Sequence, residues 1–241
     1  MTNDTRTPLD ELLRLREAHL GKALSIAHGK PLHITHGSMQ YLYAADGTRY
    51  LDLVNNVSHV GHSNPRVTQA CARQMGLLNT NTRYVYDGLT EYLGRIADTL
   101  PEPLSVGFLV NSGSEANELA VRIARAHTRD HDLAVVEGAH HGHTGMPVNP
   151  CPYKFRGPGG KGEAEPWVHV LPIPDAYGRK GVDFAAEARS AIEGAGRFAG
   201  LIIETMLSCA GQVPLPKGYL AAACRAVREQ GGLLIADEVQ V

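Results

Sequence analysis

The sequence lacks a long hydrophobic run and an excess of charge of either sign. No segment approaches the ~20 consecutive apolar residues that cross a bilayer, and the N-terminus MTNDTRTPLDELLRLRE lacks the basic and then apolar pattern of a secretory signal. The 23 basic and 25 acidic side chains give a formal net charge of −2, so bulk charge gives no reason to expect nucleic acid or a membrane as partner. We therefore predict a soluble, cytoplasmic protein.

Cysteine is scarce as well. The chain has no CxxC pair, which argues against a zinc ribbon and against a dense disulfide framework. We predict reduced thiols at all four cysteines, Cys71, Cys151, Cys209 and Cys224. With 26 Gly, 14 Pro and 20% charged residues, the composition suits a loop-rich α/β enzyme better than a coiled coil or a disordered chain.

The hydrophobic pattern separates an N-terminal segment from an alternating α/β region. The N-terminal segment is predicted to contain a helix at 9–20 and a hairpin at 39–53, with its turn at Asp46-Gly47. Helices are then predicted at 66–77, 88–99, 115–127, 183–194 and 216–230. Between them, apolar runs typical of buried strands occur at 105–110, 133–138, 167–173, 200–206 and 232–239. This alternation predicts a mostly parallel sheet covered by helices on both faces.

Ligands of such sheets bind beyond the carboxyl ends of the strands, so the strand-to-helix junctions are the first candidates. At one junction, Ser112 and Glu115 have the spacing of a capping box, which places Gly113 and Ser114 in the first turn of a helix. Backbone N–H groups of a first turn have no intrahelical partner and attract phosphate. An ordinary helix cap without a ligand is the alternative. The apolar face of this helix is expected at Ala116, Leu119, Ala120 and Ile123.

The second junction, EGAHHGHTG, contains three histidines, His140, His141 and His143. They suggest a metal, but no further Asp, Glu or His completes a familiar ligand spacing, and we predict no metal site. A planar ring at the end of a strand can instead stack on a flat cofactor, and His140 is the candidate. A structural histidine with satisfied hydrogen bonds is the alternative.

The third junction, LLIADEVQV, is an apolar run that leads to Asp237. P-loop ATPases also carry a carboxylate at a strand end, but they need GxxxxGK[ST] elsewhere in the chain. The only near match, around Gly160-Lys161, fails at both ends. It has Phe155 in place of the first glycine and Gly162 in place of Ser or Thr. No GxGxxG supports a dinucleotide site either, which weakens a nucleotide-binding function.

A phosphate-binding helix start, a ring that can stack and a carboxylate at a strand end together fit pyridoxal phosphate. Asp237 is predicted to pair with the ring nitrogen of this cofactor and to keep it protonated, so that the ring can draw electrons from a substrate carbanion. Val239 lies two residues further along the predicted strand, on the same face, and is expected to pack on the ring. Gln240 is expected to donate a hydrogen bond to the phenolic oxygen of the ring.

The sequence resembles the class-III (ω-) aminotransferases, a pyridoxal-phosphate family with the aspartate-aminotransferase fold (fold type I). The motifs that carry the resemblance are NSGSEANELAVRIAR, HHGHT and IADEVQV, in this order. The resemblance implies cofactor contacts from Gly113, Ser114, His140, Glu204, Asp237, Val239 and Gln240. Two positions depart from the family pattern. Thr205 stands where the family usually has proline, and His140 stands where it more often has Tyr, Phe or Trp.

Four further segments are similar to the ethanolamine-phosphate and phosphohydroxylysine phospho-lyases within this family: NNVSHVGHSNP (55–65), LLNTNTRY (77–84), CPYKF (151–155) and SCAGQ (208–212). Those enzymes expel phosphate instead of transferring an amino group. Arg83 and Lys154 are the candidate contacts for a substrate phosphate, and two solvated surface cations are the alternative. The choice between a transaminase and a phospho-lyase, each acting on a small primary amine, stays open.

The resemblance also implies the domain organisation. Residues 1–60 would form the N-terminal helix and hairpin of the small domain, and residues 61–241 an incomplete cofactor-binding large domain. The family holds its cofactor as a Schiff base on a lysine, and none of the six lysines follows Asp237. We therefore assign no catalytic residue and expect the N-terminal part of a longer homodimeric enzyme that is inactive alone. A catalytically dead binding module with the same fold is the alternative.

Overall fold

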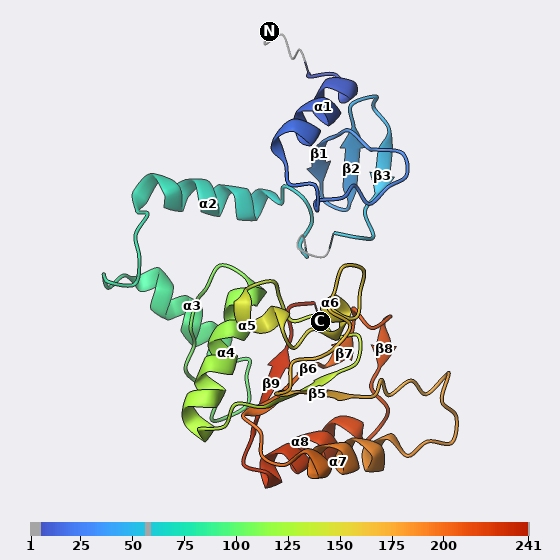
Figure 1. The fold of residues 1–241 in the computed structure, drawn as a ribbon. Helices are drawn as coiled ribbons and strands as arrows, with labels where there is room; N and C mark the ends of the chain where they lie inside the picture. The colour runs from blue at the N-terminus through green and yellow to red at the C-terminus, as the bar shows by residue number, and fades with distance from the viewer. Residues whose placement is uncertain (1–5, 56–58, 241) are drawn as a thin grey trace. The chain divides into compact units, whose positions relative to one another are not determined.

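The computed structural model describes residues 6–55 and 59–240 (Figure 1). The chain forms two compact units, Met1–Tyr86 and Asp87–Val241. The sequence predicts a different boundary, between residues 60 and 61. That boundary divides the small domain from the large domain of the family fold, and it stays a prediction. No helix among the described residues is long and apolar enough to span a bilayer.

In the first unit, the described residues form two helices and a three-stranded antiparallel sheet in the order β1-β2-β3. Its elements are α1 (Leu9–His19), β1 (Ile34–Ser38), β2 (Tyr41–Ala44), β3 (Arg49–Leu51) and α2 (Pro65–Leu77). Strands β2 and β3 form the predicted hairpin, and Gly47 adopts the positive φ of 85° that its tight turn requires. Strand β1 was not predicted, because its sequence ITHGS contains a single large apolar residue. Residues 56–58, within the segment NNVSHVGHSNP (55–65), lie outside the described residues.

The second unit is built on a four-stranded sheet in which all paired strands are parallel, in the order β5-β4-β6-β9. The strands are β4 (Leu133–Val136), β5 (Val168–Leu171), β6 (Gly200–Glu204) and β9 (Leu233–Asp237). The prediction of a parallel sheet is confirmed. Each strand ends two residues before its apolar run does, because the chain leaves the sheet there to form the loops at its carboxyl end. In the register of β6 and β9, Glu204 lies opposite Asp237.

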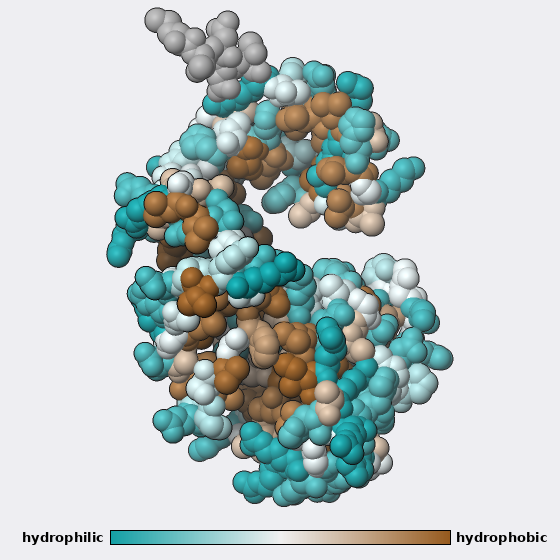
Figure 2. All heavy atoms as spheres, turned by 90° about the vertical axis from the view of Figure 1, so that its left-hand side faces the viewer, coloured by the Kyte–Doolittle hydropathy of each residue, from teal (hydrophilic) through white to brown (hydrophobic). Residues whose placement is uncertain are grey.

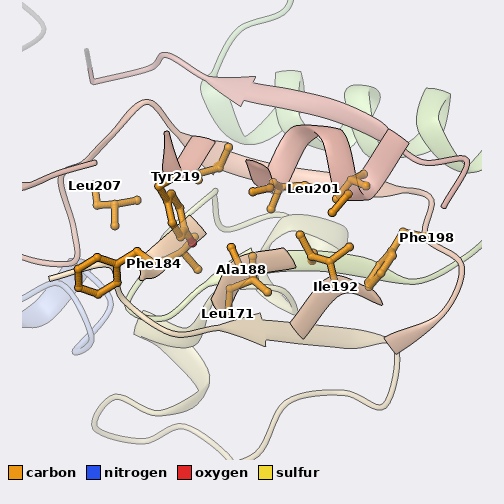
Figure 3. Packing of buried hydrophobic residues seen from close by; sticks show 14 residues of the cluster. Leu171, Phe184, Ala188, Ile192, Phe198, Leu201, Leu207 and Tyr219 are labelled. Atoms are coloured by element: carbon orange, nitrogen blue, oxygen red, sulfur yellow. The ribbon is translucent and has the colours of Figure 1, made fainter. Parts of the chain in front are cut away.

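Helices cover both faces of this sheet, as predicted. Helices α7 (Phe184–Ala195) and α8 (Tyr219–Glu229) pack on one face, where they enclose the largest apolar cluster (Figure 3). Helix α4 (Gly113–Thr128) packs on the other face, against Leu133. Alternate strand residues serve the two faces: Ala134 and Val136 join the α7–α8 cluster, whereas Leu133 and Val135 point to the opposite side.

Four short elements that were not predicted lie in the connections of the second unit: α5 (Gly145–Val148), α6 (Pro152–Phe155), β7 (Met206–Leu207) and β8 (Val213–Pro214). The connection that contains β7 and β8 follows β6, and the connection that contains α5 and α6 follows β4. Both connections leave the carboxyl end of the sheet, where the candidate site lies.

The expected apolar face of α4 was wrong. The buried residues of this helix are Asn117, Val121 and Ala124, whereas Ala116 and Ile123 are exposed. The helix carries two overlapping small or apolar stripes, and the sheet covers only one of them. A polar residue, Asn117, therefore occupies the buried stripe at its N-terminal end.

The run SVGFLV at 105–110 was also predicted wrongly as a buried strand. It lies outside all helices and strands, and Val106 and Phe108 are 84% and 66% exposed. Helix α3 (Asp87–Ala97), which precedes it, exposes Tyr92 as well. Figure 2, which views the molecule from the left-hand side of Figure 1, shows hydrophobic residues on the surface of the second unit. An apolar sequence predicts burial, but burial also needs a neighbouring element to cover it.

Candidate active site

A cavity of about 170 Å³ lies at the carboxyl end of the parallel sheet. It is lined by all seven residues that the sequence assigned to the cofactor, Gly113, Ser114, His140, Glu204, Asp237, Val239 and Gln240. It is also lined by four residues without an assigned role, Asn117, His141, Gly142 and Cys209. Its volume is below the roughly 300–1,000 Å³ of typical ligand pockets. The structure thus gathers the predicted residues into part of a ligand site, and their roles as cofactor contacts stay predictions.

The N-terminus of α4 forms one wall of this cavity. Ser112 is the N-cap residue, and its Oγ accepts a hydrogen bond of 3.2 Å from the Glu115 N–H. In return, Glu115 Oε2 accepts a 2.8 Å hydrogen bond from the Asn111 N–H. The predicted capping interaction is therefore confirmed, and Gly113 and Ser114 occupy the first turn, where the helix dipole favours an anion.

Two glycines allow other segments to approach this helix start closely. A Cβ atom on Gly113 would lie 2.5 Å from Val239 Cγ2, and a Cβ atom on Gly142 would lie 2.7 Å from Ser114 Oγ. Gly142 also has a φ of 137°, which disfavours other residues. The His143 N–H donates a 3.1 Å hydrogen bond to Ser114 Oγ. The segment after β4 and the segment after β9 are thus both held against the first turn of α4.

Asp237 is buried at the end of β9 and receives three hydrogen bonds. Its Oδ2 accepts from His141 Nδ1 at 2.7 Å and from Asn117 Nδ2 at 2.9 Å, and its Oδ1 accepts from the Val239 N–H at 3.1 Å. Burial raises the pKa of Asp237, but the hydrogen bonds and charge of His141, with those of the Val239 N–H and Asn117, outweigh it and lower the pKa below its ordinary value. The side chain is therefore an ionised carboxylate at neutral pH.

This carboxylate fits the ring nitrogen of pyridoxal phosphate. Each carboxylate oxygen can accept two hydrogen bonds, and Oδ1 of Asp237 makes one recorded bond, to the Val239 N–H. Oδ1 can therefore also accept from a protonated ring nitrogen. The sequence predicted Val239 in the same strand as Asp237 and on the same face. This was wrong, because β9 ends at Asp237 and Val239 lies in the bend that follows. Val239 nevertheless lines the cavity.

His140 fits a role in ring stacking. Burial first, and then the charges of His143 and Lys154, lower the pKa of His140, so its planar ring is neutral at neutral pH. Its Nδ1 is buried and has no hydrogen-bond partner among the described residues. The ring lies 4.7 Å from that of His143 and 5.8 Å from that of Tyr153, measured between centroids. It therefore belongs to an aromatic edge of the cavity.

Glu204 is a second buried carboxylate beside Asp237. It is 2% exposed and accepts hydrogen bonds from the Ser208 hydroxyl and from the Ser208 N–H, the latter at 3.2 Å. Thr205, the departure from the family pattern, is exposed between β6 and β7. These contacts hold Glu204 by the turn that follows β6, and its relation to a cofactor or substrate stays a prediction.

The two candidate phosphate contacts differ in their surroundings. Lys154 lies in α6 and does not line the cavity, but its charge lowers the pKa of His140 and opposes the rise that burial causes at Cys209. Its Nζ lies 5.3 Å from the centroid of the Tyr153 ring, which in turn lies 5.8 Å from the ring of His140 in the cavity wall. Arg83 belongs to the first unit, and its contact with a substrate stays a prediction.

Sequence reasoning missed the residues that hold Asp237. Asn117 could have been found, because it lies at i, i+4 and i+7 with Val121 and Ala124, and a polar side chain on a buried stripe needs a partner. No comparable signal distinguishes His141 from the histidines beside it. Among the residues that the structure describes, no group of three or more His, Cys, Asp or Glu is arranged to hold a metal ion.

Comparison with known proteins gives consistent relatives. Residues 25–241 match the sequence model of the class-III aminotransferases. The chain is 44% identical to the alanine–glyoxylate aminotransferase 2-like protein of Drosophila melanogaster, over 96% of the chain and 50% of that relative. It is 36% identical to the ethanolamine-phosphate phospho-lyase homolog 1 of Caenorhabditis elegans, over 99% of the chain and 55% of that relative.

A solved structure agrees with these relatives. The phospholyase from Arthrobacter in complex with phosphoethanolamine aligns with a TM-score of 0.86 and 35% identity, over 95% of the chain and 56% of that protein. The chain thus spans about half the length of the curated relatives that it matches.

Proposed function

The chain belongs to the class-III aminotransferases, a pyridoxal 5′-phosphate-dependent family with the aspartate-aminotransferase-like fold type I, and we propose that it forms part of an enzyme acting on a small primary amine. The observation that carries the proposal is the single cavity that combines a helix N-terminus, a neutral imidazole and an ionised carboxylate. These three groups match the phosphate, the ring face and the ring nitrogen of the cofactor.

Each wall of the cavity has a separate task in this proposal. The first turn of α4, with Gly113 and Ser114, binds the phosphate, and the neutral ring of His140 stacks on the cofactor. Asp237 keeps the ring nitrogen protonated, and Val239 and Gln240 contact the ring and its phenolic oxygen. When bound, the cofactor supplies an electron sink for negative charge on the substrate carbon that bears the amine.

Phospho-lyase activity is the second candidate, and the position of Lys154 favours it. Its Nζ lies 5.3 Å from the centroid of the Tyr153 ring, and that ring lies 5.8 Å from the ring of His140 in the cavity wall. From this position the ammonium group would attract a phosphate on the substrate. A relative named as a phospho-lyase and a phospholyase in complex with phosphoethanolamine support the same choice. Arg83 is the second proposed phosphate contact.

The test uses the complete gene product loaded with pyridoxal phosphate. Release of inorganic phosphate from phosphoethanolamine is compared with amino transfer from alanine to glyoxylate, and we expect one of the two reactions. If it is phosphate release, Lys154→Gln should lower kcat/KM for phosphoethanolamine by about tenfold to a hundredfold, the effect of one lost charge-assisted contact. Lys161→Gln, in the exposed loop, is the matched control.

Binding of the cofactor without turnover of either substrate would favour the alternative of a catalytically dead binding module. Absence of cofactor binding would contradict the proposed function altogether.

Two further properties complete the proposal. We expect a homodimer, which is supported by the family resemblance and by a cavity too small to be a whole ligand site. Light scattering of the complete gene product tests this. A cytoplasmic location rests on the sequence alone, and cell fractionation tests it.

A further inference from the structure

The orientation of the Asp237 carboxylate depends on two side chains that no motif assigned. Both His141 Nδ1 and Asn117 Nδ2 donate to the same oxygen, Oδ2, at 2.7 and 2.9 Å. Since a carboxylate only accepts hydrogen bonds, Nδ1 of His141 must carry a proton. The His141 side chain has no exposed surface, so water does not compete for this contact. The two donors together occupy Oδ2 and leave spare acceptor capacity on Oδ1.

His141 is itself fixed through its backbone. Its N–H donates to Cys151 Sγ at 3.0 Å, and its carbonyl oxygen accepts from Asn117 Nδ2 at 2.9 Å. Burial raises the pKa of the Cys151 thiol, so the thiol stays protonated and donates to the Pro147 carbonyl oxygen at 2.8 Å. Asn117 thus links the backbone of His141 to the carboxylate that the His141 ring contacts. The backbone of His141 and its ring atom Nδ1 are thus both held before any ligand binds, whereas Nε2 has no hydrogen-bond partner among the described residues.

We propose that His141 is a positioning residue, which holds Oδ2 of Asp237 so that Oδ1 faces the ring nitrogen of the cofactor. This inference rests on the proposed function, because it concerns the same cavity. It does not make His141 a catalytic residue, since the ring acts through Asp237. Other ionisable groups that line the same cavity, His140, Glu204 and Cys209, make no recorded hydrogen bond with Asp237.

A merely structural role for His141 would predict a different effect of its substitution on cofactor binding. If the ring only filled space, an apolar side chain of similar size would replace it, and the ring nitrogen of the cofactor would not matter. If the ring orients Asp237, its loss weakens the one contact that Asp237 makes with the ring nitrogen. A cofactor analogue that lacks this nitrogen should then be insensitive to the substitution.

The experiment measures dissociation constants of cofactor-depleted complete gene product for pyridoxal phosphate and for its 1-deaza analogue, in which a C–H group replaces the ring nitrogen. The wild-type protein should prefer pyridoxal phosphate. His141→Leu should reduce this preference by about tenfold or more, the effect of one charge-assisted hydrogen bond. His141→Asn, whose amide N–H can replace Nδ1–H, should retain most of the preference. Thermal unfolding establishes that each variant is folded.

Several outcomes separate this inference from the proposed function. A folded His141→Leu protein with the full wild-type preference would overturn the inference and leave the proposed function intact. Wild-type protein that does not bind pyridoxal phosphate would overturn both. If His141→Leu does not fold, His141→Asn and His141→Gln decide, because the glutamine amide corresponds to Nε2 and should lose the preference. Equal preferences of these two variants would also overturn the inference.

Discussion

The two faces of the parallel sheet differ in what they bury. The face covered by α7 and α8 packs an apolar cluster that includes Leu201 and Ile203 of β6. On the opposite face, Ile202 is followed two residues later by Glu204, and Ile235 is followed by Asp237. Because strand residues alternate between faces, both carboxylates point to the side of α4. One strand therefore contributes to the core with one set of residues and to the candidate site with the other.

Buried polar side chains follow the same division. The four buried polar or charged residues in the part of the chain that the structure describes are Asn117, His141, Glu204 and Asp237, and all of them line the cavity. Burying such groups costs free energy unless each is hydrogen-bonded. Their concentration at one end of one face is typical of a functional site rather than of a stability element. The comparison predicts that substitutions on the two faces separate stability from cofactor binding.

The largest expected effect is on the α7–α8 face. Leu201→Ala removes a fully buried side chain from the apolar cluster and should lower the free energy of unfolding by about 2–5 kcal/mol. Urea unfolding measures the loss. The dissociation constant for pyridoxal phosphate, measured on the protein that remains folded, should stay near the wild-type value. A strong loss of cofactor affinity would show that the two faces are not independent.

On the α4 face, Asp237→Asn should lower enzymatic activity. The substitution keeps the size of the side chain but removes the negative charge opposite the ring nitrogen, and turnover should fall by about a hundredfold to a thousandfold. Glu238→Gln is the matched control, because it removes the same charge from the exposed neighbouring residue. Steady-state kinetics of the complete gene product decide. Equal losses in the two variants would indicate a general charge effect and contradict the assigned role of Asp237.

Substitution of Cys151 tests whether its contact with the His141 backbone stabilises the fold. Cys151→Ala leaves the His141 N–H without its acceptor and should cost about 1–3 kcal/mol of unfolding free energy. Cys71→Ala removes an exposed cysteine and should change stability little. Chemical denaturation of both variants provides the measurement. If the two variants are equally stable, the contact between Cys151 and His141 does not contribute to the fold.

The sequence predicted the cavity walls well because motifs at strand-to-helix junctions are local signals. Ser112 and Glu115 are three residues apart, and a parallel sheet brings all such junctions to one edge. The contacts of Asp237 were beyond this reasoning, since its partners His141 and Asn117 lie 96 and 120 residues away in the chain. No pattern of spacing specifies which side chains will meet across such separations.

The wrong predictions have a related cause. The run at 105–110 and the stripe through Ala116 and Ile123 are apolar or small, but the described residues provide no element that covers them. Hydrophobic periodicity indicates that a surface can be buried, whereas the partner depends on the rest of the fold. In α8, by contrast, Ala223 and Val227 are buried, because α7 and the sheet enclose them within the same unit.

The smallest expected effect compares the helix caps of the two faces. Ser112 caps α4 through the Glu115 N–H, and Asp183 caps α7 through the Ala186 N–H at 3.0 Å. Replacing either by alanine should cost about 0.5–2 kcal/mol of stability, because one first-turn donor loses its acceptor. Only Ser112→Ala should also weaken binding of pyridoxal phosphate, since of these two helices α4 begins at the cavity and α7 does not. Calorimetric titration measures this affinity, and an equal loss in Asp183→Ala would contradict a phosphate site at the start of α4.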